Sequence, residues 1–275
     1  MAIGDTTRIK LAPSARVFVR APGTIQFGAD ATRTGLITVP DAEAVAAALG
    51  ALSKSRLLKN AVASLPLDDD TSHSLIHDLL SYRVLVPVTS PGVLVLGRGA
   101  LASQIGALLS ARGAAVRAQL KDESATKFLL DHDPSVPVVA VDCAEDAERI
   151  AAVTRGRAGA VVPVQHVDSR VVVGPVCAGG GPCPVCAWLY VLEHDPNFDH
   201  VLESLPPAET VEPVVVAAAA AAAATVVGRL AGLPDPPGVS APAPAAGDVV
   251  VVDPYSPAPV SLTRVTPHPD CPMCF

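Results

Sequence analysis

Residues 93–102 read Val93-Leu94-Val95-Leu96-Gly97-Arg98-Gly99-Ala100-Leu101-Ala102, an apolar strand followed by a glycine turn and the start of a helix. The helical pattern continues over residues 101–112, and Gly113 is expected to cap it. In this setting, backbone N–H groups and the N-terminus of a helix can hold a nucleotide phosphate. Gly97 and Gly99 are therefore candidate nucleotide-binding residues.

The chain departs from the dinucleotide-binding pattern at two places. Ala102 replaces the third glycine, which the pattern tolerates. An acidic residue is expected after the next strand, at residues 115–118, to hold a ribose. The chain reads Gln119-Leu120-Lys121 there, and the acids Asp122 and Glu123 follow one turn late. The alternative is a close-packed strand-to-helix turn without a nucleotide.

Further strands are expected at residues 136–141, 160–165, 170–173, 248–253 and 259–265, with a helix over 145–155. Fully apolar strands that alternate with helices indicate an α/β class fold with a doubly wound, Rossmann-like sheet, largely parallel and covered on both faces. After a break at residues 87–91, this domain is expected over residues 91–275. The apolar run at 214–228 is dominated by alanine and is shorter than a membrane span, so it is interpreted as a buried helix.

Residues 1–88 predict a small winged-helix-like module. Short β-branched runs at residues 16–20, 24–27 and 36–39 predict a meander of three strands. Asp41 is expected to cap a helix over 42–49, and Ser53 or Ser55 to open a second helix ending near Leu65. A third helix is expected over 74–82, capped by Thr71 or Ser72.

Composition narrows the class of protein. Half of the residues are apolar and 17% are charged, which allows a substantial core. The net charge of −7 and the lack of a basic cluster argue against nucleic acid as a partner. The first ten residues contain no apolar signal segment, so the protein is expected to be soluble and cytoplasmic.

Two motifs, Cys183-Pro-Val-Cys186 and Cys271-Pro-Met-Cys274, predict one structural zinc ion bound by four thiolates. Four thiolates fill a tetrahedral coordination sphere, so an open catalytic position is not expected. The alternatives are free buried thiols or a redox pair.

Three other residues near these motifs have weaker interpretations. Cys143 ends a predicted strand and is expected in the core. Cys177 lies in a glycine-rich loop and is either a loop residue or a reactive thiol. His268 is expected to be exposed or to support the zinc site from outside its ligand shell.

The strand–GxG–helix unit, both cysteine pairs and the apolar helix between them resemble the ThiF/MoeB-like, ubiquitin-activating fold over about residues 90–275. Members of this family adenylate the C-terminus of a peptide or a small protein. The resemblance puts Glu145 at the magnesium-binding aspartate position and leaves Lys121 and Lys127 as the candidates for phosphate contacts. The family turn GxGGLG and its DCxDN-like sequence are incomplete here, so ATP binding is not expected.

A degenerate activating fold behind a winged-helix-like module resembles the cyclodehydratase C-type, or ocin-ThiF, partners of YcaO enzymes, which help to make azoline-containing peptides. In that family, the leader of a precursor peptide adds as a strand to the three-stranded sheet and packs on the third helix. The resemblance implies peptide contacts at Thr34, Ile37 and Val39 and, on the helix, at Ile76, Leu79 and Tyr82. Core packing is the alternative for the helix residues. A homodimer is also implied.

The leading hypothesis is a non-catalytic scaffold that presents a peptide to a YcaO-type enzyme. The main alternative is an adenylating enzyme in which Glu145 serves magnesium and Cys177 forms a thioester. A third is a nicotinamide- or flavin-dependent oxidoreductase, against which the missing ribose acid and the terminal cysteine pair both argue.

Overall fold

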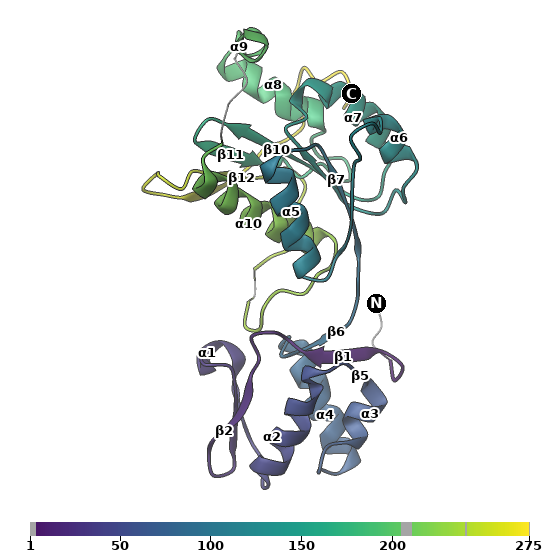
Figure 1. Ribbon diagram of the computed structural model, residues 1–275, viewed down its shortest axis with the longest axis vertical. Coiled ribbons are helices and arrows are strands. Elements are labelled where there is room, and N and C mark those ends of the chain that lie inside the picture. Colours follow the sequence, from purple (N-terminus) through teal and green to yellow (C-terminus); the bar gives the residue numbers. More distant parts are fainter. Residues whose placement is uncertain (1–3, 205–210, 240, 275) are drawn as a thin grey trace. The chain divides into compact units, whose positions relative to one another are not determined.

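The computed structural model describes residues 4–204, 211–239 and 241–274. The chain divides into two compact units, which are described one at a time (Figure 1). The first unit comprises Met1–Thr89 and Pro234–Pro242, and the second comprises Ser90–Leu233 and Ala243–Phe275.

The first unit contains two three-stranded antiparallel sheets. The strands β2 (Val17–Ala21), β3 (Thr24–Phe27) and β4 (Leu36–Thr38) pair in the order β2-β3-β4, which confirms the predicted meander. The second sheet, in the order β5-β1-β6, consists of β5 (Arg56–Leu57), β1 (Arg8–Leu11) and β6 (Leu85–Pro87). These three strands were not predicted.

The helices of the first unit are α1 (Ala31–Thr34), α2 (Ala42–Gly50), the 3₁₀ helix η1 (Ala51–Ser53), α3 (Leu58–Ala63) and α4 (Asp69–Ser81). The predicted cap of α2 is confirmed, because the Asp41 carboxylate accepts the Ala44 N–H at 3.1 Å. The other two predicted starts are wrong. The cap of α4 is Asp68, which accepts the Thr71 N–H at 2.9 Å, and α3 begins after β5 without a side-chain cap.

The core of the first unit is formed by side chains from the meander and from the helices, among them Ile25, Phe27, Leu49 and Ile76. The segment Pro234–Pro242 packs onto this unit. The guanidinium of Arg83 lies 3.4 Å from the buried Asp235 carboxylate and donates to the Val239 carbonyl at 3.2 Å. A segment distant in sequence is therefore part of the same folded unit.

The second unit is built on a seven-stranded sheet in the order β13-β12-β11-β10-β9-β7-β8. The strands are β7 (Gly92–Leu96), β8 (Ala115–Ala118), β9 (Val138–Val141), β10 (Val161–Val167), β11 (Arg170–Val173), β12 (Asp248–Val252) and β13 (Val260–Arg264). All of the strands predicted for residues 91–275 are present.

The prediction of a largely parallel sheet is wrong for half of it. The pairs β8–β7, β7–β9 and β9–β10 are parallel, whereas β10–β11, β11–β12 and β12–β13 are antiparallel. The change occurs at Asp168, whose positive φ of 51° helps to form the tight turn between β10 and β11. A connection this short can only join antiparallel neighbours.

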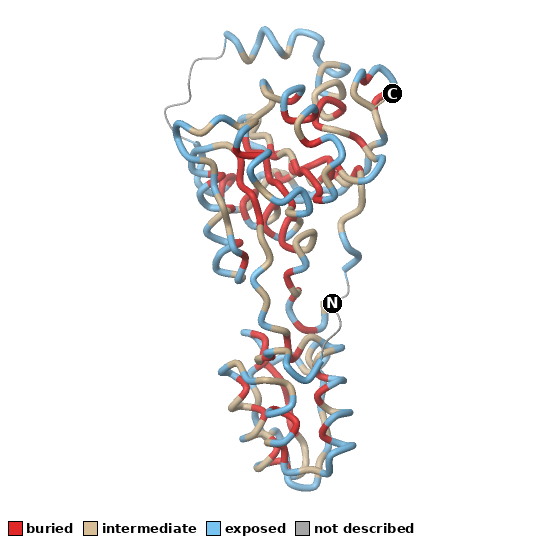
Figure 2. The backbone as a smooth tube through the Cα atoms, turned by 90° about the vertical axis from the view of Figure 1, so that its right-hand side faces the viewer, coloured by how far each residue is buried: buried red, intermediate tan, exposed pale blue. Residues whose placement is uncertain are grey.

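Helices cover both faces of the parallel half. On one face α5 (Ala100–Ala111) covers β7 and β8, and beside it in Figure 1 α10 (Pro213–Leu230) covers β11 and β12 of the antiparallel half. On the other face lie α6 (Ala125–Leu130) and α7 (Ala147–Thr154), preceded by the 3₁₀ helix η2 (Ala144–Asp146). The remaining helices are α8 (Pro184–His194) and α9 (Phe198–Ser204). Figure 2 shows buried residues running through the interior of each unit.

Among the described residues, α10 is the one helix long and apolar enough to cross a membrane, and 44% of it is buried inside the structure. Three of its alanines, Ala219, Ala220 and Ala223, are fully buried in the core with residues of α5 and of the large sheet. The core helix of a globular domain passes the same test of length and composition. This burial supports the interpretation of residues 214–228 as a core helix.

Candidate functional site

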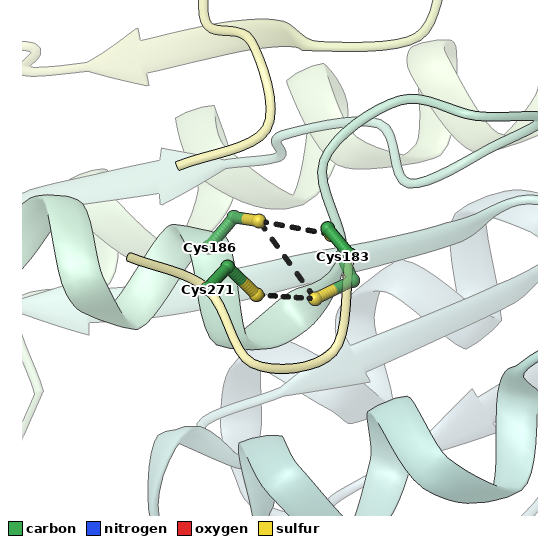
Figure 3. Close-up of side chains that lie close together, drawn as sticks. Cys183, Cys186 and Cys271 are labelled. Atoms are coloured by element: carbon green, nitrogen blue, oxygen red, sulfur yellow. Dashed lines mark hydrogen bonds between the residues drawn. The ribbon is translucent and has the colours of Figure 1, made fainter. Parts of the chain in front are cut away.

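The two cysteine pairs meet at the start of α8. Cys183 is the N-cap of this helix, and Pro184 occupies its first turn, where the missing N–H has no helical acceptor to lose. Cys186 is one turn further on, and Cys271 and Cys274 come from the segment after β13. Figure 3 shows Cys183, Cys186 and Cys271 directed toward one another.

The sulfur geometry suits a tetrahedral ion. The Sγ atoms of Cys183 and Cys186 lie 3.8 Å apart, those of Cys183 and Cys271 3.5 Å, and those of Cys186 and Cys274 3.3 Å. All four ligand atoms lie within 4.8 Å of one another. Four thiolates at about 2.3 Å from one metal would place their sulfurs about 3.8 Å apart. The four cysteines are therefore arranged to hold a metal ion.

The electrostatics of the cluster favour a cation. Burial raises the pKa of the Cys183 thiol to about 11, because a lone thiolate there would be desolvated. Burial acts in the same direction on Cys271, but hydrogen bonds from the Met273 N–H and from the neighbouring thiols outweigh it and lower the pKa. A divalent ion would stabilise all four thiolates and release their protons.

His268 supports the cluster without being a ligand. Its backbone N–H donates to the Cys186 sulfur at 3.3 Å, and its Nδ1 accepts the Asp270 N–H at 3.1 Å. The ring is 5% exposed and packs edge-on against Tyr190, with 4.9 Å between centroids. These contacts fix the loop that carries Cys271.

The predicted nucleotide residues lie at the carboxyl edge of the sheet. Gly97 has a φ of 96°, and a Cβ there would lie 2.1 Å from the Val141 carbonyl oxygen, so only glycine fits. Gly99 is the N-cap of α5 with a φ of 98°. Glu145 is exposed in η2, just beyond the end of neighbouring β9.

Side chains of this chain use the groups around the glycine turn. The side-chain Oε1 of Gln119 accepts the Gly97 N–H at 3.4 Å, and its Nε2 donates to the Glu123 carbonyl at 2.7 Å. Arg98 donates to the backbone carbonyls of Leu120 and Lys121. These contacts close the turn onto the loop after β8, in the place where a ribose acid was sought.

The predicted peptide residues fall into two groups. Ile76 and Leu79 are 1% and 4% exposed and belong to the core, as the core-packing alternative states. Tyr82, in contrast, is 69% exposed at the end of α4. Thr34 ends α1, and Ile37 and Val39 are half-buried in or beside β4.

The two remaining thiols are internal. Cys177 is 8% exposed, and its thiol donates to the Pro175 carbonyl at 3.3 Å. The Cys143 thiol donates to the Val141 carbonyl at 3.1 Å, and burial together with Asp146 and Asp142 raises its pKa to about 12. Cys143 was expected in the core, whereas it is half-buried and packs against the core beside the sheet.

Sequence reasoning missed α8 and the pocket beside it. The helix follows Cys183-Pro184 directly, and a proline at the first position of an apolar run is a helix-start signal that could have indicated it. The pocket joins residues from five strands and three helices, which no local pattern reveals.

No family model matches the chain, and no curated protein matches its sequence. Solved structures do match. A heterocyclase in complex with substrate and cofactor superposes with a TM-score of 0.60 at 16% identity, over 98% of this chain and 40% of that chain. The heterocyclase TruD gives 0.58 at 15% identity, over 98% and 43% of the two chains. The microcin C7 biosynthetic enzyme MccB, in complex with N-formylated MccA, gives 0.50 at 12% identity, over 98% and 100%.

The chain therefore has the fold of MccB and of the matched part of these heterocyclases, which confirms the predicted ThiF-like fold. It spans about two fifths of the length of the heterocyclase chains.

Proposed function

We propose that this protein is an accessory protein that binds a precursor peptide through residues 14–88 and presents it to a separate YcaO-type enzyme. The observation that carries the proposal is the free edge of β4 in the first unit. The comparison with heterocyclases is consistent with it, because the chain shares the fold of part of those proteins.

The hydrogen bonding of the meander defines the free edge. The Val39 N–H donates to the Gly23 carbonyl at 2.9 Å, and Ile37 lies opposite Ile25. Because bonded pairs alternate in antiparallel ladders, the backbone groups of Leu36 and Thr38 point away from β3. In the described part of the chain, β4 pairs with β3 alone.

An extended peptide would add to this edge as a fourth strand. The N–H and C=O groups of Leu36 and Thr38 would supply main-chain bonds, and side-chain pockets would supply the choice of sequence. Leu36 and Tyr82, which are 46% and 69% exposed, offer apolar surface for such a contact. Ile76 and Leu79 would support it from the core, and Thr34 and Val39 bound the strand at its two ends.

The second unit would serve as a scaffold in this proposal. Gln119 and Arg98 hold the glycine turn closed, and Glu145 stands in place of the magnesium-binding aspartate. Zinc is the metal proposed for the four cysteines, because closed all-thiolate sites with CxxC pairs are typical of structural zinc. A homodimer and a cytoplasmic location complete the proposal.

The test is a selection of peptides against a proline variant of the edge. A display library of random 20-residue peptides is selected on the intact chain, and the enriched peptides are then titrated against Thr38→Pro. This change removes an N–H that faces the free edge, so the internal ladder keeps its bonds. We expect binding to weaken by about fivefold to tenfold, as for the loss of one main-chain hydrogen bond.

Leu262→Pro is the matched control. It removes an outward N–H from β13, the edge strand of the other sheet, where Thr263 pairs with Val249 and Val265 bonds to Gly247. Enriched peptides should bind this variant as they bind the unchanged chain. Equal binding to Thr38→Pro would contradict the proposal.

Adenylation of a peptide C-terminus is the second candidate. It is favoured by the strand–glycine turn–helix arrangement and by the likeness to MccB, which is described as a biosynthetic enzyme. In that case Gly97 and Gly99 would approach the phosphates, and Glu145 would hold magnesium.

A further inference from the structure

A pocket of about 640 Å³ lies in the second unit, on the face of the antiparallel half-sheet opposite α10. Val164, Val171, Val173 and Val252 point into the core shared with α10. Their neighbours along the strands point the other way, because side chains alternate in a strand. The pocket floor is accordingly formed by Gln165, Val172 and Val251, which lie in one row across β10, β11 and β12.

The pocket wall is formed by helices on that face. Ala187, Trp188 and Val191 come from α8, and Phe198 begins α9. The rings of Trp188 and Phe198 pack against each other, with 5.7 Å between centroids. Val172 and Val251 are only half-buried and Val191 is exposed, so apolar surface faces solvent here.

The pocket borders the cysteine cluster and η2 through Pro184, Cys143 and Ala144, but neither Glu145 nor any of the four clustered cysteines lines it. Neither Gly97 nor Gly99 lines it, and β4 belongs to the other unit. Its volume is in the range of small-molecule sites, about 300–1,000 Å³. Single exposed apolar side chains are common on protein surfaces, whereas a contiguous apolar pocket indicates a binding site.

The charged residues that line the pocket indicate the charge of its ligand. Asp195 accepts the Asn197 N–H at 3.0 Å in the turn between α8 and α9, and the His194 ring bonds to the Tyr190 carbonyl. Arg170 is exposed at the end of β11, and the described part of the chain has no carboxylate within 4.0 Å of its guanidinium. The cation available to a ligand is therefore Arg170.

We propose that this pocket binds a small amphipathic anion, with its apolar body over Val172 and Val251 against Trp188 and its charged end at Arg170. An acyl carboxylate and the free C-terminus of an apolar peptide share this chemistry. The proposal is independent of the peptide edge on β4.

A matched pair of fluorescent probes tests the charge. 1-Anilinonaphthalene-8-sulfonate and N-phenyl-1-naphthylamine have the same ring skeleton, and only the first carries an anion. Trp188 is the single tryptophan of the chain, so energy transfer from it reports binding in this pocket. We expect one bound sulfonate probe per chain, with binding about fivefold to tenfold weaker in Arg170→Met and with the neutral probe unaffected.

Two further variants complete the test. Arg149→Met removes an exposed arginine of α7 that does not line the pocket, and it should leave both probes unchanged. Ala187→Phe fills the pocket from α8 and should weaken both probes. The proposal is overturned if Arg170→Met has no effect, if Arg149→Met weakens the anion equally, or if Ala187→Phe leaves both probes bound.

Displacement of the sulfonate probe then identifies the source of the anion. Decanoate alone displacing it indicates an acyl chain. Val-Val-Leu with a free carboxylate displacing it, when the amidated peptide does not, indicates a peptide end. Failure of decanoate and of the free peptide would overturn the assignment to a carboxylate.

Discussion

The sulfur atoms of Cys183 and Cys271 lie 3.5 Å apart, although 88 residues separate the two cysteines. The contact joins the first turn of α8 to the segment that follows β13. One metal ion bound by these cysteines would fix the segment after β13 against the first turn of α8.

Cys271→Ser tests the metal site. We expect the metal content, measured by inductively coupled plasma mass spectrometry, to fall from one ion per chain to none. The free energy of unfolding should drop by about 3 kcal/mol or more, because structural metal binding contributes directly to folding. For a unit of this size that corresponds to a melting temperature about 6–12 °C lower. Cys143→Ser, which changes a thiol outside the cluster, should keep its metal.

Metal removal should also loosen the helix that walls the pocket. Trp188 is two residues after Cys186 in α8. When a strong chelator strips the metal, we expect the Trp188 emission to shift to longer wavelength and its quenching by acrylamide to increase. Restoring zinc should reverse both changes. An unchanged emission in metal-free protein would show that the cluster does not anchor α8.

Thiol reactivity separates the scaffold from a thioester-forming enzyme. Burial raises the pKa of Cys177 well above its usual value and that of Cys143 to about 12, so both are protonated at pH 8. Because the thiolate is the nucleophile, iodoacetamide should alkylate neither within minutes in the folded, metal-bound protein. Peptide mass mapping measures this. Rapid alkylation of Cys177 would favour the enzyme.

Asp248 gives the β12–β13 hairpin a defined pH dependence. Burial alone would raise its pKa, but hydrogen bonds from Arg264 at 2.7 Å and from the Ala245 N–H at 2.8 Å outweigh burial and lower the pKa below 3.8. A lowered folded-state pKa stabilises the fold above the unfolded value, and this stabilisation is lost as the pH falls through the folded value.

Asp248→Asn should therefore cost about 1 kcal/mol at pH 7, a small figure because Arg264 is largely exposed. The difference in unfolding free energy between the two proteins should shrink below pH 3.8. Urea titrations at a series of pH values measure it. A difference that is constant with pH would rule out the carboxylate as its origin.

The sequence predicted the elements with strong local signals. The strands of the large sheet, the cap of α2 and the position of the core helix α10 all follow from apolar runs and capping residues. The predicted start of α4 was wrong, because several residues there can cap a helix and Asp68, rather than Thr71 or Ser72, is the N-cap. The antiparallel half of the sheet was not predicted, because it depends on a tight turn at Asp168. Aspartate tolerates a positive φ, but its presence in a sequence does not predict one.

The candidate sites were predictable to different degrees. The cysteine cluster could be predicted from the sequence, because its residues form two CxxC motifs and one tetrahedral metal ion would bring the two pairs together. Tyr82 is exposed and Ile76 is buried because of the way α4 packs on the first unit. Helical periodicity alone does not fix which of these side chains faces the core. The contact between Gln119 and the glycine turn could not be predicted from the sequence, because a glutamine side chain at the end of a strand has no characteristic partner.

Titration of the metal-bound chain with magnesium ATP by calorimetry, with pyrophosphate exchange measured in the presence of a display-selected peptide, distinguishes recruitment from activation most directly. A recruiting protein predicts that the selected peptide binds while ATP gives no saturable heat and no exchange. Micromolar ATP binding together with peptide-dependent exchange would contradict the scaffold role and establish an adenylating enzyme.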